Sequence, residues 1–384
     1  MNSRFAIVSK YLAGSAAVAV ALLCVPTPGL AQATTAITQP KAVPALDDFA
    51  QIPLPRGNFK GWCGRKDRFL VGFEGQLEAY EGDSKVVIPT MIPFATEIQC
   101  DEDGRQLAYV NKGIGRAVKV DIASGASKIL AEFAPFYTLA KRSESDADVV
   151  SISPDLRMIA TDGKLKPAQD VRVIELPSPN LVGHVRWSED SSRLFYVLRE
   201  PDESGVVVVD TSQKKLGGGV LPTKSWFRDG WFTADGESVL LYLVDQRNES
   251  GPGFVVRCRI ADWKCNRLKS NIDQISVGGR GRIATISPYQ VKPDPSDYDD
   301  GTIPIHPKYL AEVLESESRL VAKQVVLTRE SRTRLRWPYR LLVSPRGTKV
   351  VLTWQVEKYV GCVPPNWDAE CIEAKMFDLS RGVR

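Results

Sequence analysis

The chain has 384 residues, 43% of them hydrophobic and 25% charged, which is the composition of a globular protein with a sizeable core. Its 50 basic and 46 acidic residues nearly balance. This balance does not indicate the clustered basic surface that nucleic-acid binding requires, so we expect no nucleic-acid partner.

The N-terminal segment has the three parts of an export signal. Two basic residues precede the apolar stretch YLAGSAAVAVALLCV (residues 11–25), which is shorter than the ~20 residues that span a membrane. Small residues then predict cleavage after Ala31 or Ala33. We therefore expect residues 1–33 to be removed as a signal peptide, with residues 34–57 forming a short tail.

Export sets the expected compartment of the mature chain. A lipoprotein signal at Cys24 fits less well, because the bulky Leu23 precedes it where a small residue is expected. Cleavage removes two of the 50 basic residues, Arg4 and Lys10, and none of the 46 acidic ones, which leaves 48 against 46. No second long apolar run follows. We expect a soluble monomer in the periplasm of a Gram-negative bacterium, or a secreted one, without a membrane span.

After the tail, one short pattern recurs: an apolar or Cys residue, a polar turn that often contains Asp or Gly, and a strand of alternating apolar residues. Six copies are clear, and a fainter one, VGGRGRIATI, begins at Val277. The six are CGRKDRFLVGF (from Cys63), CDEDGRQLAYV (Cys100), ISPDLRMIAT (Ile152), WSEDSSRLFYV (Trp187), FTADGESVLLYLV (Phe232) and VSPRGTKVVLTW (Val343).

A second apolar strand follows each copy after a gap, so each repeat contains two hairpins and about four strands. The copies begin roughly 35–65 residues apart, a spacing typical of β-propeller blades. We predict an all-β fold, a single β-propeller over residues 58–384 with four-stranded antiparallel blades. The pattern indicates seven blades, with six as the alternative. Trp187, Trp231 and Trp354 are interpreted as packing residues between blades.

A ring of blades leaves two open sheet edges unless its ends are joined. The C-terminal stretch AKMFDLSRGVR supplies a third strand for the last blade but leaves too few residues for a fourth. The tail contains an extended stretch, LDDFAQIPLP (46–55), that belongs to no repeat. We predict that Phe49–Leu54 pairs with Lys375–Leu379 as the outer strand of the last blade and closes the ring.

Three of the copies carry a family resemblance. ISPDLRMIAT, WSEDSSRLFYV and VSPRGTKVVLTW resemble the WD40-like (PD40) blade, S-P-D-G-x-x-L-A-Y, of TolB-like propellers of the bacterial periplasm. TolB itself has an additional N-terminal α/β domain, for which residues 34–57 are too short, so the chain is not predicted to be TolB. Other proteins with such blades include envelope scaffolds and the propeller half of some serine peptidases. The peptidases need a hydrolase domain with G-x-S-x-G, which the sequence lacks.

The cysteines fit an exported protein. Of the seven, Cys24 lies in the signal, and the remaining even number favours disulfides over metal thiolates. There is no CxxC motif, so we predict no metal site and no cofactor. The predicted bridges are Cys63–Cys100, Cys258–Cys265 and Cys362–Cys371.

Catalysis is the alternative to binding. The two histidines, His184 and His306, stand in unrelated contexts and are too few for a grouped metal site. His184 is interpreted as a rim or core residue, and no catalytic residue is assigned. A mechanism that uses carboxylates alone stays open, because acidic residues are plentiful.

Residues 288–320 depart from the repeat. A loop rich in Pro and Asp is followed by a predicted helix over Pro307–Ser318, and loops added to a rigid scaffold often carry binding. The acidic residues resemble a calcium loop, but with Asp297 as the first ligand the Gly comes one position early and Lys308 occupies the twelfth position. A solvated acidic loop is the simpler interpretation. The acidic residues of this loop are Asp294, Asp297, Asp299 and Asp300, and the last three are candidates for partner binding.

A second departure is TRESRTRLRWPYR, residues 328–340. If this stretch is extended, Arg332, Arg334 and Arg336 project to one face, with Arg340 nearby. Such a face is either a solvated edge or a site for a phosphate, a carboxylated glycan or an acidic protein.

The leading hypothesis is a non-catalytic periplasmic module that binds a protein or an acidic envelope component on one rim of the propeller. The alternative is a carboxylate-dependent glycan or lactone enzyme that uses the central pocket. An enzyme would show converging acidic side chains with perturbed pKa values at the axis.

Overall fold

The computed structural model of the protein describes residues 42–55, 57–73, 76–88, 95–111, 114–133, 150–161, 164–167, 174–176, 182–199, 204–222, 225–246, 251–289, 298–299, 303–304, 308–315, 319–327, 329–331, 334–357 and 372–381. Within these residues no helix is long and apolar enough to cross a membrane. The predicted signal peptide lies outside them.

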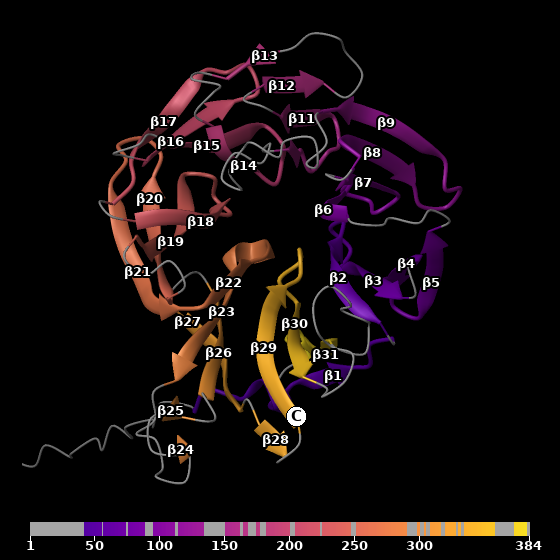
Figure 1. Ribbon diagram of the computed structural model, residues 1–384, viewed down its shortest axis with the longest axis vertical. Coiled ribbons are helices and arrows are strands. Elements are labelled where there is room, and N and C mark those ends of the chain that lie inside the picture. Colours follow the sequence, from indigo (N-terminus) through magenta and orange to yellow (C-terminus); the bar gives the residue numbers. More distant parts are fainter. Residues whose placement is uncertain are drawn as a thin grey trace, which may run out of the picture. The chain divides into compact units, whose positions relative to one another are not determined.

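Seven antiparallel sheets of four or five strands, all within the compact unit Val43–Arg384, are arranged in a ring (Figure 1). The fold is therefore a seven-bladed β-propeller, as the repeat pattern predicted. In blades 1 to 6 the first strand in sequence lies nearest the axis and the last lies at the periphery.

Blades 1 to 4 follow one another along the chain. Blade 1 contains β2 (Asn58–Cys63), β3 (Arg68–Phe73), β4 (Gln76–Glu81) and β5 (Ser84–Ile88). Blade 2 contains β6 (Ala95–Cys100), β7 (Gln106–Asn111), β8 (Arg116–Asp121) and β9 (Ser127–Glu132). Blade 3 contains β10 (Ser151–Ile152), β11 (Met158–Thr161), β12 (Lys164–Pro167) and β13 (Ile174–Glu175). Blade 4 contains β14 (Val182–Trp187), β15 (Arg193–Arg199), β16 (Ser204–Asp210) and β17 (Lys215–Val220).

The last three blades are less regular. Blade 5 contains β18 (Ser225–Phe232), β19 (Ser238–Asp245), β20 (Gly253–Arg259) and β21 (Cys265–Ile272). Blade 6 contains β22 (Gln274–Val277), β23 (Ile283–Tyr289), β26 (Lys308–Glu315) and β27 (Arg319–Leu327). Blade 7 contains β28 (Arg329–Ser331), β29 (Arg334–Val343), β30 (Lys349–Glu357), β31 (Ile372–Asp378) and β1 (Ala50–Ile52). Two single-turn 3₁₀ segments are η1 (Leu46–Asp48) and η5 (Gly279–Gly281), and β24 (Tyr298–Asp299) pairs with β25 (Ile303–Pro304).

Each copy of the repeat is the turn that joins the innermost strand of a blade to its second strand. In blade 4 the Ser188 hydroxyl donates to the Asp190 carboxylate at 2.6 Å, and that carboxylate also accepts the Ser192 N–H at 3.1 Å. The residue between them, Ser191, has a φ of 60°. The Ser-x-Asp motif of the repeat therefore forms a self-contained turn, in which the aspartate carboxylate accepts a backbone N–H of the same turn.

The ring closes as the sequence predicted. β1 pairs with β31, with Ala50 opposite Asp378 and Ile52 opposite Met376. Leu46 and Phe49, which precede and adjoin β1, are 0% and 4% exposed and pack between blades 6 and 7. The N-terminal tail thus supplies the outer strand of the last blade and removes its open edge.

Hydrophobic clusters fill the spaces between blades. Trp187, Trp231 and Trp354 each pack against such a cluster, as predicted for them. The largest fully buried side chains include Phe195, Tyr196 and Phe377, which come from strands next to the innermost ones or further out.

The predicted helix over Pro307–Ser318 is wrong. Within it, Lys308–Glu315 form β26, the third strand of blade 6, hydrogen-bonded to β23 on one side and β27 on the other. Ala311 and Val313, two positions apart, are both fully buried. Burial at every second residue is the pattern expected of a strand. The Ala, Glu and Leu content of the segment favours a helix, but two neighbouring strands and a buried face override that propensity.

Candidate binding site at the axial mouth

The seven turns that join the innermost and second strands lie on one face of the propeller, around its axis, and we call this the turn face. A cavity of about 590 Å³ opens there between the turns of blades 6, 7, 1 and 2. That volume is within the range of small-molecule and peptide sites. It is lined by Arg65, Lys66, Glu102, Asp103, Arg280, Pro345, Arg346 and Thr348.

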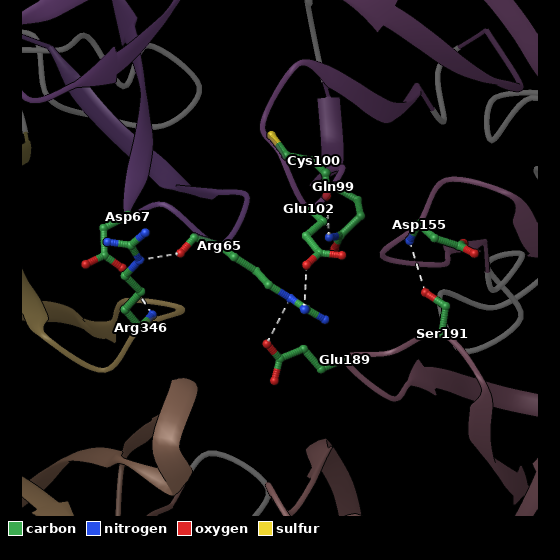
Figure 2. A network of polar contacts seen from close by, with 9 residues as sticks. All are labelled: Arg65, Asp67, Gln99, Cys100, Glu102, Asp155, Glu189, Ser191 and Arg346. Carbon is green, nitrogen blue, oxygen red and sulfur yellow. Dashed lines mark hydrogen bonds and ion pairs between the residues drawn. The ribbon is translucent and has the colours of Figure 1, made fainter.

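Arg65 links the turns around this cavity (Figure 2). Its Nη1 donates to Glu102 Oε1 at 2.6 Å in blade 2, and its Nε lies 3.5 Å from Glu189 Oε1 in blade 4. Its backbone carbonyl accepts a hydrogen bond from Arg346 Nε at 2.9 Å. One side chain of blade 1 therefore contacts groups from blades 2 and 4, while its backbone contacts blade 7.

The third position of the turn explains where the positive charge comes from. In blades 3, 4 and 5 it holds Asp155, Asp190 and Asp235, and each accepts a hydroxyl and an N–H from its own turn. In the turns of blades 6, 7 and 1 the same position holds a basic residue instead, namely Arg280, Arg346 and Lys66. The three exceptions to the aspartate pattern are neighbours in the ring, and all three line the cavity.

Two of these aspartates, Asp190 and Asp235, are held in their ionised form. Partial burial opposes the ionisation of Asp190, but hydrogen bonds from the Ser188 and Ser192 hydroxyls outweigh it and lower its pKa to about 2. The hydrogen bond from the Thr233 hydroxyl likewise lowers the pKa of Asp235. Of the acidic residues that the structure describes, Asp273, between β21 and β22, has a pKa raised by burial.

The boundary between blades 1 and 2 is rigid beside the cavity. A disulfide joins Cys63 to Cys100, and the Arg65 N–H donates to Glu102 O at 2.8 Å. Gly64 has a φ of +72°, and a Cβ there would lie 2.7 Å from the Gly104 nitrogen. Only glycine fits this approach, so the Arg65 and Glu102 turns are fixed against each other.

The boundary between blades 7 and 1 is held by a buried carboxylate. Asp67 is 5% exposed, and it accepts the Arg346 N–H at 3.1 Å and the Thr348 hydroxyl at 2.5 Å. The backbone that carries Arg346 is therefore anchored to the turn that carries Lys66.

The predicted partner-binding residues that the structure describes do not line this cavity. Arg334 and Arg336 are in β29, which reaches the turn face only at Val343, so they lie towards the opposite face. Arg340 is exposed on the same strand, and its charge adds to burial in lowering the pKa of Lys60. Asp299 is in β24, within an insertion that leaves blade 6 at the opposite face, after β23. The remaining candidates, Asp297, Asp300 and Arg332, lie outside the described residues.

The other residues singled out in the sequence, where the structure describes them, take part in disulfides or in side-chain packing. The bridges Cys63–Cys100 and Cys258–Cys265 are confirmed, whereas Cys362–Cys371 lies outside the described residues. The His184 ring packs against Phe227, with centroids 5.0 Å apart. His306 is also outside the described residues. Within the described part of the chain, no group of three His, Cys, Asp or Glu side chains is placed to hold a metal ion.

Sequence reasoning missed the cavity, although one signal for it was visible. The copies CGRKD, VGGRG and VSPRG carry Lys or Arg where SPD, SED and TAD carry aspartate. Reading that exchange as a feature of one site requires knowing that the three turns are neighbours around the axis.

Comparison with known proteins gives the fold and no family. The sequence matches no protein-family model and no curated protein. An oligogalacturonate lyase from Vibrio parahaemolyticus is 9% identical, with a TM-score of 0.54 over 86% of this chain and 91% of that one. The Cps50 (Swd1) propeller domain of Myceliophteria thermophila is 10% identical, with a TM-score of 0.50 over 86% and 98%. TolB from Acinetobacter baumannii is 13% identical, with a TM-score of 0.41 over 71% of this chain and 65% of that one.

Proposed function

We propose that the chain is a non-catalytic, monomeric interaction module of the periplasm, and that it binds a protein or an acidic envelope component at the axial mouth of the turn face. The observation that carries this proposal is the replacement of the structural aspartate by Arg280, Arg346 and Lys66 in three neighbouring turns around one cavity. Each replacement gives up the hydrogen bonds that the aspartate makes inside its own turn. Their common position favours a role in attracting an anionic partner.

We further propose that the chain belongs with the TolB-like, PD40-type propellers. The Ser188–Asp190 turn supports this placement, because it gives the Ser-x-Asp motif of that blade a physical role. The distant likeness to solved propellers concerns the fold alone.

The alternative function, a carboxylate-dependent glycan or lactone enzyme, needs a carboxylic acid that is protonated near neutral pH and can donate its proton. The lowered pKa values of Asp190 and Asp235 on the turn face are opposite to that requirement.

The test uses the mature chain as bait for an envelope extract, with captured proteins identified by mass spectrometry and then measured as purified partners. One variant reverses the cavity charges, with Lys66→Glu, Arg280→Glu and Arg346→Glu. The matched control reverses three charges of the predicted arginine face, with Arg332→Glu, Arg334→Glu and Arg336→Glu.

We expect the cavity variant to lose the partner and the control to keep it. The control should keep the melting temperature of the native protein, and the cavity variant, which also loses the hydrogen bond from Arg346 Nε to the Arg65 carbonyl, should still unfold in one cooperative transition. Loss of capture by the control alone would instead place recognition on residues 288–340. Capture that survives in both variants would exclude the axial mouth as the binding site.

A further inference from the structure

The charges at the axial mouth are divided by sign. We call Lys66, Arg280 and Arg346 the basic arc, since they come from the neighbouring blades 1, 6 and 7. Glu102 of blade 2 and Glu189 of blade 4 pair with Arg65, and Asp103 of blade 2 lines the same cavity; we call these three residues the acidic arc. Four basic residues, Arg65 and the basic arc, and two acidic residues, Glu102 and Asp103, line the cavity itself.

The two arcs do not neutralise each other. Arg65 stands between them and pairs with Glu102 and Glu189, so one cation serves two carboxylates (Figure 2). In the part of the chain that the structure describes, no side chain of the basic arc forms an ion pair within 4 Å. The pKa of Glu81 is lowered mainly by its hydrogen bond from Arg68 and further by the charges of Lys66 and Arg346. The Glu102 and Glu189 side chains are 64% and 66% exposed, so both are accessible from solvent. The mouth therefore keeps a positive side and a negative side.

This separation is fixed by a disulfide, a backbone hydrogen bond and the buried Asp67 carboxylate, and not by the charged side chains of the two arcs. The Cys63–Cys100 disulfide and the hydrogen bond from the Arg65 N–H to the Glu102 carbonyl hold the acidic side. The Asp67 hydrogen bond to the Arg346 N–H holds the basic side. A ligand that matches both sides would bind without first ordering the turns, which lowers the cost of binding.

The sign pattern restricts the chemistry of the ligand. A purely anionic ligand is attracted by the basic arc but repelled by the three carboxylates of the acidic arc. A purely cationic ligand is attracted by the acidic arc but repelled by the basic arc. Like charges that face each other across an interface reduce affinity for the wrong partner. A ligand with both signs, a short distance apart, satisfies both arcs.

We infer that the axial mouth recognises a dipolar polypeptide segment, in which acidic residues that contact the basic arc are followed or preceded by basic residues that contact the acidic arc. This inference rests on the proposed binding function and specifies the chemistry of its partner. Phosphate or an acidic glycan would use the basic arc alone.

The test measures binding of fluorescent peptides to the full mature protein by anisotropy at low salt. The probes are Glu-Glu-Gly-Gly-Lys-Lys, its reverse sequence, Glu-Glu-Gly-Gly-Gly-Gly and Gly-Gly-Gly-Gly-Lys-Lys, with inorganic phosphate as a competitor. One of the two dipolar peptides should bind about fivefold more tightly than either single-sign peptide, since one exposed ion pair contributes up to about that factor.

Two variants separate the arcs. The triple variant Lys66→Gln, Arg280→Gln and Arg346→Gln should lower the affinity for the dipolar peptide by about tenfold or more. Glu102→Gln with Glu189→Gln should abolish the dipolar preference and make the all-acidic peptide bind as tightly as the dipolar one. A single cooperative thermal transition in each variant controls for folding.

The inference is overturned if the all-acidic peptide or phosphate binds the native protein as tightly as the dipolar peptides, or if no peptide binds. Those outcomes leave the proposed function to its own test, because an envelope partner could still depend on the basic arc. Loss of dipolar preference in the glutamate variant, with envelope capture retained, would be consistent with both proposals.

Discussion

The tail that closes the ring can be tested by removing its buried side chains one at a time. Leu46 and Phe49 are 0% and 4% exposed within the cluster between blades 6 and 7. Truncating a buried Leu or Phe to Ala costs about 2–5 kcal/mol, so Leu46→Ala and Phe49→Ala should each lower the free energy of unfolding by about 3 kcal/mol. In a domain of this size, about 1 kcal/mol shifts the melting temperature by 1–2 °C.

The assay is thermal unfolding followed by circular dichroism and calorimetry. The control is Gln51→Ala, because Gln51 is on the same closing strand but exposed, with its side chain bonded only to Asp47 among the contacts described. We expect shifts of several degrees for the two buried variants, within one cooperative transition, and almost none for the control. If the melting temperatures of Leu46→Ala and Phe49→Ala match that of Gln51→Ala, the tail does not close the ring.

Three further predictions concern the turns. Non-reducing mass spectrometry should find Cys63 joined to Cys100, and replacing both with Ser should cost about 2–4 kcal/mol of stability while weakening ligand binding, because the bridge fixes the Arg65 turn. Gly64→Ala should destabilise the fold by more than about 1 kcal/mol in chemical denaturation, and a neutral result would contradict the close approach to blade 2. Asp190 has a native pKa of about 2 against an ordinary value of 3.8, so its stabilisation is present above about pH 4 and is lost as the pH falls through 2. The melting temperatures of the native protein and of Asp190→Asn should therefore converge between pH 4 and pH 2, and a constant difference would refute the assignment.

Much of the fold was predictable because its main signal is local. In blades 3, 4 and 5 the turn satisfies its own backbone, as Ser188 and Asp190 do, so this pattern is visible in the sequence however the blades are arranged. The closing strand was predictable by counting strands. The helix prediction failed at Ala311 and Val313, because residue preference cannot show that two strands flank a segment and bury its alternate side chains.

The site was less predictable because its charges are scattered along the chain. Arg332, Arg334 and Arg336 were predicted as a binding face because they are close in sequence. Lys66 and Arg346 are at opposite ends of the chain and meet only when the ring closes. A search that compares the same turn position across repeats finds such residues, whereas a search for runs of charge does not.

Ring closure and the candidate site are physically linked at the boundary between blades 7 and 1. At the periphery, β1 joins β31. At the axis, Asp67 holds the Arg346 backbone, and its near-complete burial makes these hydrogen bonds costly to lose. Between the ends of the ring there is no disulfide among the residues that the structure describes, in contrast to the bridge between blades 1 and 2. The basic arc spans this non-covalent boundary, so its geometry depends on a closed ring, and a charged ligand that contacts both blades would stabilise the closed state by mass action.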